Sequence, residues 1–253
     1  MQTIDKHSYY VSFTDDYTQW TTIYLMKKKS KVFTHYKSFK AWCKTQLGAP
    51  IKVARTDRGG EYMSRAFDRH LAEKGTVRIT ALHDTPEYNG VLERLNRTGL
   101  ERTWAFLHAS GLLKFLWGEA ISHVVWLKNR TTTHALSEGK TPYEMLYKTK
   151  PDLSKIFDWG APIWVHDATG DKLGACGVLG WWVGLDRDSG SHRVYWPGKH
   201  SITVERSVRH ASQEVLVPAL QPLALERLCS AMADSALVVP SSSSFGNPSP
   251  PQC

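Results

Sequence analysis

Two runs near the start of the chain carry the residue types that favour β-strands. Residues 9–14 (YYVSFT) and 21–26 (TTIYLM) are rich in β-branched and aromatic side chains. Asp15 and Asp16 lie between them, where short acidic side chains suit a turn. The pattern predicts a hairpin whose turn and strand end hold both acids.

A helical period follows the hairpin. Ser30 is a candidate N-cap, and apolar side chains then recur on one face over residues 32–43 until Gly48 ends the helix. The next predicted elements are a strand at 51–54, a helix from Ser64 to Gly75, a strand at 77–80, and helices over about 90–109 and 115–129. Strands mixed with helices in this order predict an α/β sheet with flanking helices.

The pattern changes beyond residue 150. Short β-like runs separated by Gly, Asp and Ser predict a small all-β module; they lie at 161–166, 180–185, 193–196 and 201–205. Pro142 begins a short helix in the segment that links the two parts. We therefore expect a core at 1–130, a helical linker at 131–157, a β module at 158–215 and a disordered tail at 216–253, with a short helix at 222–233.

Composition narrows the class of protein. The chain has 253 residues, ordinary fractions of hydrophobic (42%) and charged (22%) residues, and a net charge of +8, which favours polyanionic partners, nucleic acid first. It contains no run of 18 apolar residues and no signal-peptide pattern, and its four cysteines are scattered. We expect an intracellular protein, nuclear or cytoplasmic and not secreted, with no membrane segment and no small-molecule cofactor.

Two carboxylates stand out as candidates for chemistry. Asp57 follows a short apolar strand and precedes Gly59 and Gly60, and Glu93 lies near the start of a helix. Carboxylates on neighbouring elements can share a hard divalent cation such as Mg²⁺, and such ions assist phosphoryl transfer. Spacing alone favours an ordinary turn acid and a solvated helix acid over a metal site.

The text around these acids resembles the integrase core of copia-type retrotransposons. RTDRGGEYMSRAF and TPEYNGVLERLNRT carry the resemblance, together with YYVSFTDDYTQWTTIYL, FLWGEA, NRTTTHAL and GKTPYEMLYKTKPDL, over about residues 8–210. The resemblance implies an RNase H-like core, followed by an SH3-like module, and a DDE polynucleotidyl transferase that uses Mg²⁺ or Mn²⁺. Asp57 and Glu93 match the second and third acids of its triad.

The first acid of that family has no counterpart in this sequence. In relatives it lies on a strand before the one that resembles residues 9–13, and this strand and its Asp are expected to be missing. Asp15 and Asp16 match a different motif of the family. Because two-metal catalysis needs converging carboxylates, we expect little or no strand transfer from this chain.

Several basic and polar residues near the two acids are candidates for nucleic-acid contact: Arg58, Arg94, Asn96 and Arg97. Arg58 stands where relatives have Asn. Arg forks suit phosphate, although the same residues also fit a solvated helix face in which Arg97 pairs with Glu93. The run Lys27–Lys31 more often marks a soluble loop. Most Trp and Tyr rings of the β module are expected in its core.

Three hypotheses about function follow. The chain is an integrase that joins element ends to target DNA, or a non-catalytic nucleic-acid-binding remnant, or a decayed open reading frame. The resemblance also implies self-association, since retroelement integrases act as multimers.

Overall fold

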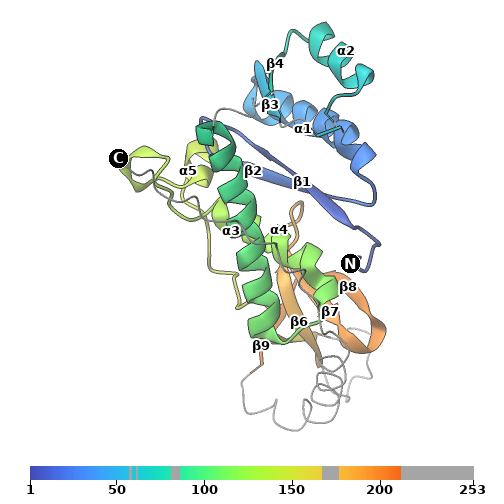
Figure 1. Cartoon of the computed structure of the whole chain (residues 1–253). Coiled ribbons are helices and arrows are strands. Elements are labelled where there is room, and N and C mark those ends of the chain that lie inside the picture. Colours follow the sequence, from blue (N-terminus) through green and yellow to red (C-terminus); the bar gives the residue numbers. More distant parts are fainter. Residues whose placement is uncertain (57–58, 61, 81–85, 167–176, 212–253) are drawn as a thin grey trace, which may run out of the picture. The chain divides into compact units, whose positions relative to one another are not determined.

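The computed structural model describes residues 1–211 except 57–58, 61, 81–85 and 167–176, and it does not describe the side chains of residues 86–95 and 138 (Figure 1). The chain divides into two units, Met1–His210 and Ala211–Cys253, and all elements below belong to the first. The predicted tail and its helix at 222–233 lie outside the described residues. Within the described part, no helix is both long and apolar enough to cross a membrane.

The predicted hairpin is confirmed with its bounds unchanged. Strand β1 (Tyr9–Thr14) pairs antiparallel with β2 (Thr21–Met26). Asp15 forms the turn, because its carboxylate accepts hydrogen bonds from the backbone N–H of Thr18 at 2.8 Å and from the Thr18 hydroxyl at 2.7 Å. The acid therefore has the turn role that the sequence predicted.

The helix after the hairpin is confirmed, but its start is not the predicted one. Helix α1 (Val32–Leu47) buries Tyr36, Phe39 and Cys43 and ends at Gly48, whose φ of 63° is the left-handed conformation that glycine tolerates. The prediction of Ser30 as N-cap is wrong, since Ser30 lies inside a 3₁₀ turn (Lys29–Lys31). The turn precedes α1 directly, so no side chain caps the helix.

The next three elements form a parallel β-α-β unit. Strand β3 (Val53–Thr56) pairs parallel with β4 (Val77–Thr80), and α2 (Arg65–Glu73) connects them. β3 begins two residues later than predicted. Ser64 is confirmed as the N-cap of α2, because its hydroxyl accepts a hydrogen bond from the Phe67 N–H at 3.3 Å.

Three helices follow. Helix α3 (Pro86–Ser110) is longer than predicted, whereas α4 (Trp117–Lys128) is a little shorter. Helix α5 (Pro142–Tyr147) begins with a capping box. In this box the Thr141 hydroxyl accepts from the Glu144 N–H at 3.1 Å, and the Glu144 carboxylate accepts from the Thr141 N–H at 2.9 Å.

Removal of this cap gives a stability prediction. We expect Thr141→Ala to lower the free energy of unfolding by about 1 kcal/mol, because the N-terminal N–H groups of α5 lose their acceptor. Thr141→Ser keeps the hydroxyl and should lose less than half as much. Urea denaturation of both variants measures the difference, and equal losses in the two would show that the hydroxyl contributes nothing.

The last part of the unit is an antiparallel five-stranded sheet in the order β8-β7-β6-β5-β9. Its strands are β5 (Pro162–His166), β6 (Gly177–Leu185), β7 (His192–Trp196), β8 (Ser201–Glu205) and β9 (Val208–His210). Trp182 and Tyr195 are almost fully buried, as expected of core rings. The predicted class, an α/β part followed by an all-β part, is confirmed, and β9 is an additional strand. The SH3-like assignment stays a prediction.

Side chains of the helices and of the sheet share one hydrophobic cluster. Leu107 of α3 and Ala120 of α4 pack with Val183 and Tyr195 of the sheet, and Trp159 completes the cluster. The domain boundaries predicted at residues 130 and 157 stay predictions.

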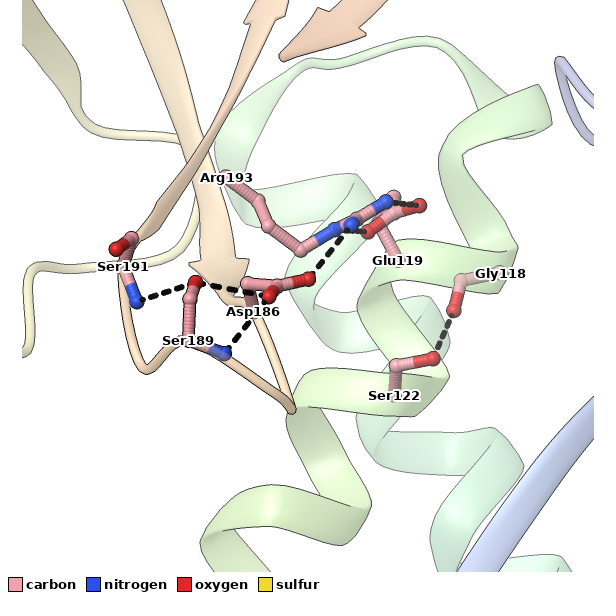
Figure 2. A network of polar contacts seen from close by, with 7 residues as sticks. All are labelled: Gly118, Glu119, Ser122, Asp186, Ser189, Ser191 and Arg193. Carbon is pink, nitrogen blue, oxygen red and sulfur yellow. Dashed lines mark hydrogen bonds and ion pairs between the residues drawn. The ribbon is translucent and has the colours of Figure 1, made fainter. Parts of the chain in front are cut away.

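A polar network also joins α4 to the sheet (Figure 2). The guanidinium of Arg193 on β7 donates two hydrogen bonds to Glu119 on α4, at 2.7 and 2.9 Å. Asp186 lies 3.4 Å from the same guanidinium and also accepts from the backbone and hydroxyl of Ser189. Burial lowers the pKa of Arg193, but the two carboxylates raise it further, so the net shift is upward.

Candidate functional site

The strand that leads to the first candidate acid is in place. β3 ends at Thr56, the residue that precedes Asp57 in the sequence. Asp57 and Arg58 themselves lie outside the described residues.

The chain beyond Asp57 is anchored by a basic side chain of β4. The N–H of Tyr62 donates to the Gly59 carbonyl at 2.9 Å, which forms a tight turn. Arg78 donates to the Tyr62 carbonyl at 2.6 Å, pairs with Asp68 and lies over the Phe67 ring with its Cζ 4.9 Å from the ring centroid. Arg78 therefore joins Tyr62 to the first turns of α2.

Helix α3 carries four of the candidate residues: Glu93, Arg94, Asn96 and Arg97. Glu93 and Arg94 lie within its bounds, but their side chains are not described. Asn96 and Arg97 are exposed. Arg97 Nε lies 3.8 Å from the Glu101 carboxylate, one turn further along the helix, and both side chains are more than half exposed. The predicted pairing of Arg97 with Glu93 lies outside the described side chains.

Residues of both β3 and α3 line a cavity of about 1130 Å³. Residues of β1, α1 and β3 line it, and among the lining residues are Thr56 and Asn96. Thr56 precedes Asp57 by one residue, and Asn96 follows Glu93 by three residues, which is close to one helical turn. The neighbours of both candidate acids therefore border the same cavity.

Two strands that line the cavity each have one edge without a neighbouring strand in the described part of the chain. Within the described residues, β1 pairs only with β2 and β3 pairs only with β4, and both β1 and β3 line the cavity. Main-chain groups at such edges need partners, because unpaired N–H and C=O groups are costly when water is excluded.

The described part of the chain contains no group of three His, Cys, Asp or Glu side chains that could hold a metal ion. Asp15 is engaged in its turn, and Asp16 lies 3.5 Å from Arg55 in an exposed ion pair. The predicted metal pair, Asp57 and Glu93, falls outside the side chains that were searched.

A second, smaller cavity adjoins the same helix. Asn96 and Arg102 of α3 line it together with Lys128 of α4. The ammonium of Lys128 donates to the Gln19 carbonyl at 2.9 Å and to the Thr21 hydroxyl at 2.8 Å. Burial lowers the pKa of Lys128 to about 8. The spacing of charges along the sequence did not single out this lysine.

Several residues of the shared motifs have structural roles here. Asn129 accepts from the Thr21 N–H at 2.9 Å and donates to the Thr21 carbonyl at 2.7 Å, so its amide binds the β2 backbone as a neighbouring strand would. Gly118 is close to β2, since a Cβ at this position would lie 2.9 Å from a Leu25 methyl group. These residues hold α4 against the hairpin.

Comparisons with known proteins place the chain among transposon sequences. No family model matches it. It is 28% identical over 217 residues to the retrovirus-related Pol polyprotein from transposon TNT 1-94 of Nicotiana tabacum, which is 85% of this chain and 16% of the relative. It is 30% identical over 184 residues to the corresponding polyprotein from transposon RE1 of Arabidopsis thaliana, which is 70% of this chain and 12% of the relative. The chain thus spans less than one-fifth of these relatives, and its resemblance to retrotransposon sequences is confirmed.

Solved structures that resemble the chain include the HTLV-2 integrase catalytic core domain in complex with magnesium, in a trimeric form. This match has a TM-score of 0.40 and 19% identity, and covers 53% of this chain and 82% of that one. A simian T-cell lymphotropic virus intasome in complex with PP2A regulatory subunit B56 gamma matches with a TM-score of 0.44 and 15% identity, over 80% of this chain and 72% of that one. At these TM-scores the superpositions are too loose to transfer residue positions.

Proposed function

We propose that this chain, a relative of a segment of the retrovirus-related Pol polyproteins of plant transposons, is a copia-type integrase fragment that binds DNA and has an incomplete catalytic site. The observation that carries the proposal is the shared cavity beside Thr56 and Asn96, the neighbours of the two candidate acids. A strand end and a helix that border one cavity are a place where α/β proteins gather functional groups.

Asp57 and Glu93 are the proposed ligands of Mg²⁺ or Mn²⁺. Carboxylate oxygens are the donors that such hard cations prefer, so the residue types fit the ion. When bound, the ion would activate the attacking oxygen and stabilise the leaving oxygen of a phosphodiester. In this proposal, β3 and α3 hold the two carboxylates at the cavity that Thr56 and Asn96 line.

Within the described residues β2 is the one ladder partner of β1 and β4 is that of β3, and this pairing supports an incomplete site between β1 and β3. A strand between them would pair with both edges and would fill the cavity that they border. The resemblance to the copia-type integrase core implies such a strand, and in that family it bears the first acid. With two of three carboxylates, metal ions are held less firmly, and a displacement of about 1 Å can lower a rate by about 10²-fold.

A strand-transfer assay tests the catalytic part. With Mn²⁺, duplex DNA of element-end sequence and a target plasmid, we expect the full chain to give no joined product above background. Product that disappears in Asp57→Asn but persists in Asp16→Asn would instead establish a working integrase.

Arg58, Arg94, Asn96 and Arg97 are the proposed contacts to DNA phosphates. Asn96 and Arg97 are exposed on α3. Asn96 also lines the cavity. The exposed pair of Arg97 with Glu101, at 3.8 Å, is weak and leaves the guanidinium able to exchange its partner for phosphate.

The DNA proposal predicts a change in salt dependence. Each phosphate contact contributes about one counterion to the dependence of binding on salt, so Arg97→Gln should reduce the slope of log K against log[KCl] by about 1. Arg69→Gln on the exposed face of α2 removes the same charge and should leave the slope unchanged. Fluorescence anisotropy of labelled duplex DNA from 50 to 200 mM KCl measures both.

The two alternative hypotheses predict different results in these assays. A soluble, folded chain that binds DNA without joining it is the non-catalytic remnant, whereas an insoluble chain without DNA binding is a decayed reading frame. Self-association, which the resemblance implies, and an intracellular location are also part of the proposal. Analytical ultracentrifugation tests self-association, with a monomer at all concentrations as the contrary result.

A further inference from the structure

Arg130 has an environment that neither the candidate site nor the core explains. Its guanidinium Cζ lies 3.9 Å from the ring centroid of Trp126 and 4.8 Å from that of Tyr143. Its Nη1 donates to the Trp126 carbonyl at 3.2 Å. Guanidinium groups carry five N–H donors, so most of the donors of Arg130 have no partner among the described residues.

No carboxylate partner of Arg130 occurs among the side chains that the structure describes. Half-buried arginines are ordinarily paired with an acid, as Arg193 is with Glu119. The aromatic rings stabilise the cation and fix its plane, but they accept none of its in-plane N–H groups. Burial lowers the pKa of Arg130, which reflects this uncompensated charge.

Tyr147 brings a hydroxyl beside the Tyr143 ring, and the loop between β6 and β7 carries a second guanidinium. Arg187, in the loop between β6 and β7, has its Cζ 5.8 Å from the Tyr24 ring centroid. Tyr147 has a ring 4.7 Å from that of Tyr143, and it is 45% exposed. Burial and then Tyr143 raise the pKa of Tyr147, whereas the charges of Arg130 and Arg187 both act to lower it, so both cations are within electrostatic reach of this hydroxyl.

We propose that Arg130 and the Tyr147 hydroxyl, which flank the Tyr143 ring, form a phosphate-binding site that holds a backbone phosphate of the bound nucleic acid, and that Arg187 adds positive charge to it. The chemistry is specific to a tetrahedral oxyanion: one guanidinium is fixed in its plane by two rings, a second brings further charge, and a phenol supplies an O–H donor. A pre-ordered fork loses little side-chain entropy on binding, which favours contact with phosphate over a mobile lysine.

The site rests on the proposed DNA binding but is distinct from the α3 contacts. It is built from the C-terminal end of α4, from α5 and from the β6–β7 loop, whereas Asn96 and Arg97 lie on α3. The nucleic acid would therefore contact both the α/β part and the β part of the chain.

Binding of duplex DNA by the full chain tests the inference. We expect Arg130→Gln and Arg187→Gln each to weaken binding at 100 mM KCl by about 3- to 10-fold and to reduce the salt slope by about 1. Arg130→Lys should keep the slope but weaken binding about 3-fold, because an ammonium cannot present the fork. Tyr147→Phe keeps the ring and should weaken binding about 2-fold, and Arg69→Gln is the matched control.

A second measurement does not depend on stable variants or on DNA. In ¹H–¹⁵N spectra of the Arg Nε groups, inorganic phosphate should shift the Arg130 and Arg187 signals together and saturate in the millimolar range. Saturation by free phosphate with unchanged DNA binding in all four variants would overturn the nucleic-acid assignment. If the chain binds DNA, unchanged slopes together with unshifted signals would refute the site alone, whereas the absence of any DNA binding would refute the proposed function.

Discussion

Between pH 6.5 and 4, the free energy of unfolding should fall by about 3 kcal/mol because of one buried histidine. His123 on α4 is 4% exposed, and its ring lies 5.1 Å from that of Trp182 and 5.9 Å from that of Trp126. Its Nδ1 has no hydrogen-bond partner among the described residues. Burial lowers the pKa of His123 to about 4, so the folded chain keeps this ring neutral.

The direction of this change in the free energy of unfolding with pH follows from proton linkage. Between about pH 4 and the ordinary histidine pKa of about 6.5, the unfolded chain binds more protons at this position than the folded chain. The stabilisation is complete above pH 6.5 and is lost as the pH falls through that window. Burial also lowers the pKa values of His35, His70 and His192, which adds a dependence of the same sign.

A substitution separates His123 from the other histidines. His123→Phe keeps a ring against Trp126 and Trp182 but cannot titrate, so the fall in stability between pH 6.5 and 4 should be smaller by about 3 kcal/mol than in the parent chain. His134→Gln, at an exposed position, should change nothing. Urea denaturation at several pH values measures this, and equal pH dependence in parent and His123→Phe would refute the assignment.

The second large effect is expected at the network of Figure 2. Glu119→Ala should destabilise the chain by about 2–3 kcal/mol, since it leaves the guanidinium of Arg193 with Asp186 as its remaining acid. The side chains of Arg193 and Glu119 are only 28% and 12% exposed, so water replaces the lost bonds poorly. Arg193→Lys should lose about 1 kcal/mol, because a compact ammonium cannot present the planar fork that the guanidinium offers to Glu119.

An exposed ion pair provides the control. Asp16 and Arg55 lie 3.5 Å apart with side chains 83% and 51% exposed, and Asp16→Ala should cost less than about 0.5 kcal/mol. Combining Glu119→Ala with Arg193→Met closes a double-mutant cycle, in which we expect a coupling of about 1–3 kcal/mol. A coupling near zero in that cycle would show that the hydrophobic cluster, and not this ion pair, holds α4 against the five-stranded sheet.

Local sequence determined the elements that depend on near neighbours. The hairpin at 9–26, the Ser64 cap and the helix from Pro142 were predictable because each depends on side chains and backbone groups only a few residues apart. The prediction of Ser30 as an N-cap was wrong. Serine is a good capping residue, but here it lies inside the 3₁₀ turn through which the chain enters α1. Asp57 and Glu93 were predictable as candidates from residue type and from the shared motifs.

Tertiary structure decided what joins distant parts of the chain. Glu119 and Arg193 are 74 residues apart, and Asn129 and Thr21 are 108 apart, so no local pattern announces either contact. The rings around Arg130, and the cavity that Thr56 and Asn96 share, likewise exist only once β2, α3, α4 and α5 have packed. Residue type determined which chemistry was available, and packing between distant elements determined where it converged, because burial and proximity are properties of the folded chain.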